Sequence, residues 1–197
     1  MTNEERITNF AKENNDYITR KNVDNLKIHH YYLTNLVKKG TLIKISKGVY
    51  MLNNAIKDDY YIISQGSKHA VFSHATALYL HELSDRIPLN YDVTVNYKYS
   101  GNLAKNNNIT LRYVDAKIFK LGTTEIDTIN GLTIRVYDIE RTICDIVRDK
   151  KNMDREIFKK ALKAYAKLPN KNILKLMKYA KILKIEEEVI KYMEVLL

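Results

Sequence analysis

Three side chains in the middle of the chain have the types and order of a metal-dependent nuclease site. Asp92 lies in the alternating segment 91–97, and Asp115 and Lys117 follow the next alternating segment. In nucleases of the PD-(D/E)xK pattern, two such carboxylates hold magnesium and the lysine orients the attacking water. Because such patterns also arise often by chance, they do not establish a nuclease. A magnesium-dependent nuclease is an alternative that the sequence leaves open.

Other reactive side chains lack the partners that catalysis needs. Ser73 and His74 are adjacent, but the sequence indicates no third member of a hydrolase triad. Gly66-Ser67 could begin a nucleotidyltransferase signature, but the pair of aspartates that would bind magnesium does not follow. Cys144 is the only cysteine and falls on the apolar side of a predicted helix, which favours a core thiol. We therefore predict a protein that is not an enzyme and that uses no cofactor and no metal.

Another set of polar side chains has the chemistry of DNA recognition. Segment 29–39 is predicted to be a helix whose buried side carries Leu33, Leu36 and Val37. Asparagine can bond adenine through both amide atoms, lysine reaches guanine or phosphate, and threonine contacts the thymine methyl group. Side chains of these types face outward from the helix: His30, Tyr31, Thr34, Asn35 and Lys38. Phosphate contacts are expected from basic residues nearby, namely Arg20, Lys21, Lys44 and Lys47.

The elements that position these side chains form a winged helix-turn-helix. A first helix covers residues 2–14, and Thr19 can cap a short second helix. Helix 29–39 ends at Gly40, and strands TLIKI and GVYML flank the turn Ser46-Lys47-Gly48. The usual partner of this arrangement is double-stranded DNA. Winged helices also serve as protein-interaction modules, which is the other interpretation.

The rest of the chain predicts an α+β domain. A helix at 74–83, strand segments at 91–97, 109–115 and 116–122, and a hairpin around Asn130-Gly131 indicate a small, mostly antiparallel sheet. After Tyr137 the apolar spacing becomes helical and predicts a bundle of helices at 138–149, 154–168, 171–183 and 185–196. We expect a winged helix-turn-helix domain at 1–58 and a second domain at 59–197. Its sheet-containing part is expected at about 67–137 and its helical part at about 138–197.

Basic side chains are concentrated in two parts of the chain. The 197 residues carry 33 lysines and arginines and 23 acids, a formal net charge of +10. Residues 17–57 hold eight basic and one acidic side chain, residues 151–184 hold eleven and two, and residues 67–150 hold eleven and ten. Such a concentrated excess favours a polyanionic partner. A second basic surface is therefore predicted, with a solvated helix face as the alternative, at Lys160, Lys163, Lys167, Lys171, Lys175 and Lys178.

Membrane association is not expected. No apolar run approaches the roughly 20 residues that a membrane helix needs. The first residues, MTNEERITNF, are polar and begin with acids, unlike a signal peptide. These features predict a soluble cytoplasmic protein.

Three blocks together resemble the AbiEi-type antitoxins of bacterial abortive-infection toxin–antitoxin systems. They are LVKKGTLIKISKGVYML, VFSHATALYLHELSDRIP and IRVYDIERTICDIVRD, and the last two are the more specific. The resemblance implies a winged helix that binds inverted repeats in the promoter of its own operon and represses it. It also implies a C-terminal antitoxin domain that neutralises a cognate nucleotidyltransferase-like toxin, with or without a stable complex.

The resemblance carries over no catalytic residue. Its closely matched polar residues are expected to hold the C-terminal domain together: Ser73, His74, Arg86, Asp138, Glu140 and Arg141. A monomer in solution or a dimer on DNA would fit. A plain winged-helix transcription regulator with an unrelated sensing domain stays open as an alternative, beside the nuclease.

Overall fold

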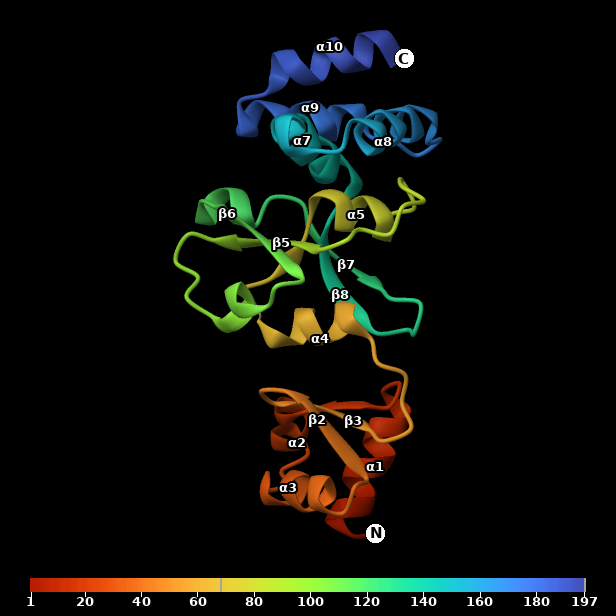
Figure 1. The fold of residues 1–197 in the computed structure, drawn as a ribbon, viewed down its shortest axis with the longest axis vertical. Coiled ribbons are helices and arrows are strands. Elements are labelled where there is room, and N and C mark those ends of the chain that lie inside the picture. The colour runs from red at the N-terminus through yellow and green to blue at the C-terminus, as the bar shows by residue number, and fades with distance from the viewer. Residues whose placement is uncertain (68, 197) are drawn as a thin grey trace. The chain divides into compact units, whose positions relative to one another are not determined.

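The computed structural model describes residues 1–67 and 69–196 (Figure 1). The chain divides into two compact units. The N-terminal unit comprises residues 1–68 and 127–134, and the C-terminal unit comprises residues 69–126 and 135–197. The α+β fold class is confirmed by this combination of helices and two separate sheets.

The N-terminal unit contains the predicted helices and hairpin. In order, its elements are α1 (Asn3–Glu13), β1 (Tyr17–Thr19), α2 (Arg20–Asn25), α3 (Tyr31–Lys38), β2 (Leu42–Ser46), β3 (Val49–Leu52) and α4 (Asp59–Gly66). The Thr19 hydroxyl accepts a hydrogen bond from the Asn22 amide, which confirms the predicted cap of α2. Gly40 has a φ of +72°, as expected for the end of α3. Strand β1 and helix α4 were not predicted; β1 pairs antiparallel with β3 and completes a sheet of order β1-β3-β2.

An apolar core fixes the helices of this unit against its sheet. Leu33 and Leu36 on the inner side of α3 pack with side chains from α1, β1, α2, β2 and β3: Ile7, Ala11, Ile18, Val23, Leu42 and Leu52. Burying one aliphatic side chain of this size contributes about 1.5–3 kcal/mol. This burial determines which side of α3 is left for solvent.

The loop between β7 (Thr123–Asp127) and β8 (Thr133–Tyr137) supplies part of the N-terminal unit. Leu132 packs in a cluster with Tyr17, Val49 and Met51. Asp58 is buried, and its carboxylate accepts hydrogen bonds from the Thr128 hydroxyl at 2.6 Å and the Asn130 amide at 2.9 Å. A segment more than 60 residues downstream therefore completes this unit.

The second sheet has five strands in the order β6-β5-β4-β8-β7. These strands are β4 (Val71–Phe72), β5 (Tyr91–Asn96), β6 (Ile109–Val114), β7 (Thr123–Asp127) and β8 (Thr133–Tyr137). The sheet is mixed where the sequence favoured a mostly antiparallel one, because β5–β6 and β4–β8 are parallel pairs. Residues 97–108, which include the short helix η1 (Asn102–Lys105), return the chain so that β6 starts beside the start of β5.

Two short helices belong to the sheet-containing region. Helix α5 (His74–Leu80) begins directly after β4, at the predicted position. Segment 116–122, predicted as a strand, instead contains helix α6 (Ala116–Phe119). The carboxylate of Asp115 accepts a hydrogen bond from the Lys117 amide and caps α6. This local cap outweighs the strand-like composition of the segment.

The predicted C-terminal helices are confirmed (Figure 1). Their ends lie within two residues of the predicted ones. They are α7 (Ile139–Arg148), α8 (Arg155–Lys167), α9 (Ile173–Leu183) and α10 (Glu186–Leu196), and the short η2 (Lys150–Asn152) follows α7. Side-chain caps start three of them, because Asp138, Asp154 and Asn172 each accept a hydrogen bond from an amide of the first turn. Among the described helices, none is both long and apolar enough to cross a membrane.

Candidate nucleic-acid interface

The outer side of α3 presents a polar stripe. Tyr31, Thr34 and Lys38 are exposed, and Asn35 is half-buried between them. Residues spaced by three and four positions lie along one side of a helix, so these side chains form a row about two turns long. His30 is exposed at the N-cap position and continues this row. The helix thus brings together all five side chains that the sequence assigned to base recognition.

The predicted phosphate-contacting residues lie on α2 and the wing, the β2–β3 hairpin. The Arg20 amide donates a hydrogen bond of 2.8 Å to the Gly48 carbonyl oxygen. This bond places the start of α2, with Arg20 and Lys21, beside the turn that carries Lys47. Lys44 lies on β2 in register with Tyr50 of β3. All four basic side chains are exposed.

Other polar residues near α3 were missed by the sequence reasoning. His29 precedes α3 and accepts a hydrogen bond from the Tyr31 amide at its Nδ1, while its ring stacks on His30 with centroids 4.3 Å apart. Lys39, next to Lys38, forms a 2.7 Å ion pair with Glu4 of α1 and so serves the fold. The adjacent histidines at 29 and 30 are visible in the sequence, but the stacking of their rings is not, because it depends on the short connection between α2 and α3.

A polar hollow of about 360 Å³ adjoins α2. Lys21, Asn22 and Asn25 of α2 line it together with Gln65 of α4 and residues 131–133. No sequence pattern links these segments, because they meet only through the folding of the N-terminal unit. The amide groups that line this hollow could hydrogen-bond a polar ligand. Its one cation, Lys21, is already among the residues predicted to contact phosphate.

The six lysines predicted to form a second basic surface do not share one environment. Three of them have partners in the fold: Lys160 lies 3.3 Å from Glu156, Lys171 donates to the Leu168 carbonyl, and Lys175 lies 3.1 Å from Asp138. The other three are exposed on α8 and α9, at Lys163, Lys167 and Lys178. Their contact with DNA stays a prediction.

The residues of the nuclease alternative are not brought together. Asp92 pairs in register with Thr110, and Asp115 follows the end of β6, five residues after Thr110. At about 3.3 Å per residue, the two backbone positions are separated by about 16 Å along the sheet, whereas carboxylates that share a magnesium ion each lie about 2 Å from it. Asp92 instead lies 3.3 Å from Arg112 and is buried. Within the described residues, no cluster of histidine, cysteine and acidic side chains could hold a metal.

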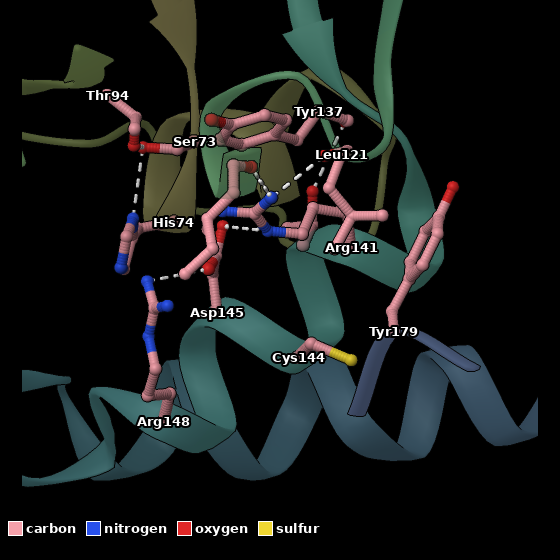
Figure 2. A network of polar contacts seen from close by, with 12 residues as sticks. Ser73, His74, Thr94, Leu121, Tyr137, Arg141, Cys144, Asp145, Arg148 and Tyr179 are labelled. Carbon is pink, nitrogen blue, oxygen red and sulfur yellow. Dashed lines mark hydrogen bonds and ion pairs between the residues drawn. The ribbon is translucent and has the colours of Figure 1, made fainter. Parts of the chain in front are cut away.

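The C-terminal unit contains a buried polar network around Arg141 (Figure 2). The side chain is 0% exposed; its Nε donates to Asp145 at 3.0 Å, and its Nη1 donates to the carbonyl oxygens of Ile118 and Leu121. Its guanidinium carbon also lies 4.1 Å from the centre of the Tyr137 ring. Arg141 and Asp145 are four positions apart, the spacing of an ordinary ion pair on a helix surface. The pair exists, but it is fully buried and ties α7 to the segment around α6.

Ser73 and His74 form a second part of this network. The Ser73 hydroxyl lies 3.0 Å from His74 Nδ1 and accepts a hydrogen bond from Thr94, and His74 Nε2 lies 3.8 Å from Asp149. The sequence indicated no third partner for Ser73 and His74, and in the structure the acidic side chain beside His74 Nε2 is Asp149. Ser73 and His74 are 0% and 2% exposed, so substrate has no access to them. Burial lowers the pKa of His74, although nearby Asp145 opposes this effect.

The remaining matched residues also serve the fold. Asp138 caps α7, and buried Glu140 accepts a hydrogen bond from the Asn172 amide at the start of α9. Arg86 is exposed and lies 3.5 Å from Asp154. Cys144 is buried, and burial raises the pKa of its thiol to about 12, so it is a core thiol as predicted.

Comparison with known proteins agrees with this arrangement. Residues 5–53 match the model of a family described as "Transcriptional regulator, AbiEi antitoxin". The match confirms the resemblance over the N-terminal region and supports a DNA-binding regulator of the antitoxin type. The other two blocks of the resemblance lie outside the matched residues. No curated protein matches the chain.

The fold is also similar to a solved structure. It is the crystal structure of the RV2827C protein from Mycobacterium tuberculosis, with a TM-score of 0.61 and 10% sequence identity. The alignment covers 96% of this chain and 75% of that chain. At this identity the likeness concerns the fold alone.

Proposed function

We propose that this protein is an antitoxin that binds the promoter of its own operon and represses it. The observation that carries the proposal is the exposed polar stripe of α3 beside the basic wing, within residues that match an antitoxin family of transcriptional regulators. In this proposal residues 1–58 bind DNA and residues 59–197 neutralise a nucleotidyltransferase-like toxin encoded beside the gene. Both activities would take place in the cytoplasm.

In the proposed complex α3 enters the major groove. Asn35 and Thr34 contact base edges. The phosphates on either side are contacted by Arg20, Lys21, Lys44 and Lys47. The exposure of Thr34 and of the basic side chains supports this assignment, and Asn35 is half-buried on the same outer side of α3. Two molecules on an inverted repeat would place their half-sites about 34–36 Å apart, or a multiple of this distance.

A gel-shift titration against the DNA upstream of the operon tests the repressor function. Each phosphate contact contributes a slope of roughly −0.9 to the dependence of log K on log salt concentration. Four contacts per molecule, at Arg20, Lys21, Lys44 and Lys47, predict a slope of about −3.6 for one bound molecule. A scrambled duplex of the same composition is the control. Absent binding, or binding that salt does not weaken, would contradict the proposal.

The antitoxin function has a separate test. The neighbouring gene is expressed alone and together with this protein, and bacterial growth is recorded. We expect growth arrest by the neighbour and recovery with this protein. If the neighbour is harmless while the DNA is bound specifically, the protein is a plain transcription regulator instead.

A further inference from the structure

A groove of about 550 Å³ lies between α8 and α10, at the C-terminal end of the chain. Its apolar lining comes from Phe158 and Leu162 of α8 and from Tyr192, Val195 and Leu196 of α10. The Phe158 and Tyr192 rings meet edge to face, with centroids 5.3 Å apart. Val195 is 83% exposed, so this end of the apolar lining lies open to solvent. Grooves of this size commonly bind ligands through their apolar surface.

Lysines surround the apolar lining on both walls. Lys159 and Lys163 project from α8, Lys191 projects from α10, and Lys150 lies 5.8 Å from the Tyr192 ring. Glu188 is the one acid among the groove residues. In the part of the chain that the structure describes, no acidic side chain lies within 4 Å of the Lys159, Lys163 or Lys191 ammonium groups. The groove is therefore apolar inside and carries an excess of unneutralised positive charge along its edges.

We propose that this groove binds an amphipathic acidic helix of a partner protein. A helix with apolar residues at i, i+3, i+4 and i+7 presents a stripe that fits a groove between two helices. Glutamates or aspartates on either side of that stripe would meet Lys159 and Lys163 on one wall and Lys191 on the other. The proposal uses α8 and α10 and no part of the winged helix, and it shares only Lys163 with the predicted second basic surface, so it can be tested apart from promoter binding by the winged helix.

Two other anionic partners fit the groove less well. A nucleic-acid backbone pairs with lysines but does not need an apolar floor. A membrane surface takes up apolar side chains that project outward, whereas Phe158 and Leu162 are recessed between two helices. An acidic helix uses both the floor and the edges.

Fluorescence anisotropy with a labelled peptide tests the proposal on the full chain. The probe is a helical peptide of about four turns, with leucines at the stated spacing and glutamates elsewhere. We expect saturable binding by the protein. The double variant Lys159→Glu/Lys191→Glu should bind it at least about tenfold more weakly, and should instead bind a peptide that carries lysine in place of glutamate.

Matched variants distinguish peptide binding in the groove from nonspecific electrostatic and apolar binding elsewhere on the surface. Lys120→Glu/Lys181→Glu makes the same charge change at exposed positions outside the groove and should alter affinity less than about twofold. Val195→Asn removes an exposed apolar side chain of the groove and should weaken binding. Leu174→Asn is its control, because Leu174 is 86% exposed on α9 and does not line the groove.

Three results would overturn the proposal. One is no binding of the acidic peptide, and another is equal weakening by both double variants. The third is flotation with phosphatidylglycerol vesicles that depends on Lys159 and Lys191 while the peptide does not bind, since this would identify a lipid surface as the partner. Circular dichroism of each variant confirms that the fold is retained.

Discussion

Two sets of charged side chains, one in each unit, are used in opposite ways. In the N-terminal unit Lys38, Lys44 and Lys47 are exposed and project from a helix and a hairpin. In the C-terminal unit Arg141 and Asp145 are both 0% exposed and bind each other and the backbone. Exposed charge costs little in stability and is available to a partner, whereas buried charge needs an opposite charge and hydrogen bonds, which Arg141 has at Nε and Nη1.

This difference shows what the sequence blocks report. The more specific blocks, FSHATAL and YDIERTICD, supply Ser73, His74, Arg141 and Asp145. In the structure these four residues join α5 and α7 to their surroundings. The less specific block, around the wing, supplies the exposed cations proposed to bind DNA. The blocks that carry the family resemblance most specifically therefore contain buried polar residues that hold the fold together. The less specific block contains part of the proposed contact surface.

The largest expected effect is on the buried network. Arg141→Ala leaves Asp145 with only Arg148 and leaves the Ile118 and Leu121 carbonyl oxygens without their donor. We expect the free energy of unfolding to fall by about 3–5 kcal/mol, measured by urea denaturation followed by circular dichroism. Arg86→Ala, at an exposed ion pair, should change it by less than about 0.5 kcal/mol. Similar losses of unfolding free energy in both variants would show that the buried and the exposed charge contribute alike to stability.

A pair of glycines gives the next largest contrast. Gly40 and Gly122 both have a φ of +72°, but a Cβ at Gly40 would meet no atom within 4 Å, whereas at Gly122 it would lie 2.6 Å from the Arg141 Cβ. Gly40→Ala should cost about 1–2 kcal/mol from backbone strain. Gly122→Ala should cost about 1–3 kcal/mol more, because it also displaces Arg141. Equal urea midpoints for the two variants would show that the network tolerates displacement.

In the N-terminal unit the expected effect is on binding and not on stability. Asn35→Ala should cost about 1–3 kcal/mol of operator affinity and relax the preference at one base position. Lys47→Ala should weaken binding to operator and scrambled DNA alike and reduce the salt slope by about 0.9. Competitive gel shifts with single-base operator variants measure both. If the two substitutions act alike, the assignment of α3 as the base-reading helix is wrong.

The smallest expected effect is a pH dependence that arises from His74. Burial lowers its folded pKa below the ordinary value of 6.5, so the unfolded chain binds a proton that the folded chain does not. Stability is therefore complete above pH 6.5 and falls as the pH drops below it, by up to about 1.4 kcal/mol per pH unit. His74→Asn should flatten this slope, and asparagine tolerates the φ of +48° at this position. An unchanged slope would assign the effect to another group.

Local signals predicted much of the fold. Thr19, Gly40, Asp138 and the Ser46–Gly48 turn each act within a few residues, so they were visible in the sequence. Helical spacing likewise identified all four helices after Tyr137. Helix α4 was missed because DYYIIS contains residues that also favour strands, although Asp58 was an available cap.

The remaining features depend on contacts between distant segments. The parallel pairing of β5 with β6 depends on the path of the connecting segment, which leaves no short-range pattern. The two carbonyl oxygens that bind Arg141 belong to backbone more than 15 residues upstream. Because every residue has a backbone carbonyl group, the sequence does not indicate which of them will accept these hydrogen bonds. For the candidate interface, the outward side chains of α3 followed from its periodicity. The position of Arg20 beside the wing turn did not, because it depends on one backbone hydrogen bond between distant residues.

The insertion of residues 127–134 into the N-terminal unit affects how the protein is made. A ribosome delivers residues 1–68 first, and at 5–20 residues per second it needs several more seconds, roughly 3–13, to reach residue 134. During this interval Asp58 lacks Thr128 and Asn130, and the cluster around Tyr17 lacks Leu132. A nascent or truncated chain that ends before the loop therefore carries the complete sequence of the helix-turn-helix without its complete core. Formation of the complete N-terminal core is thus coupled to the synthesis of the half that follows.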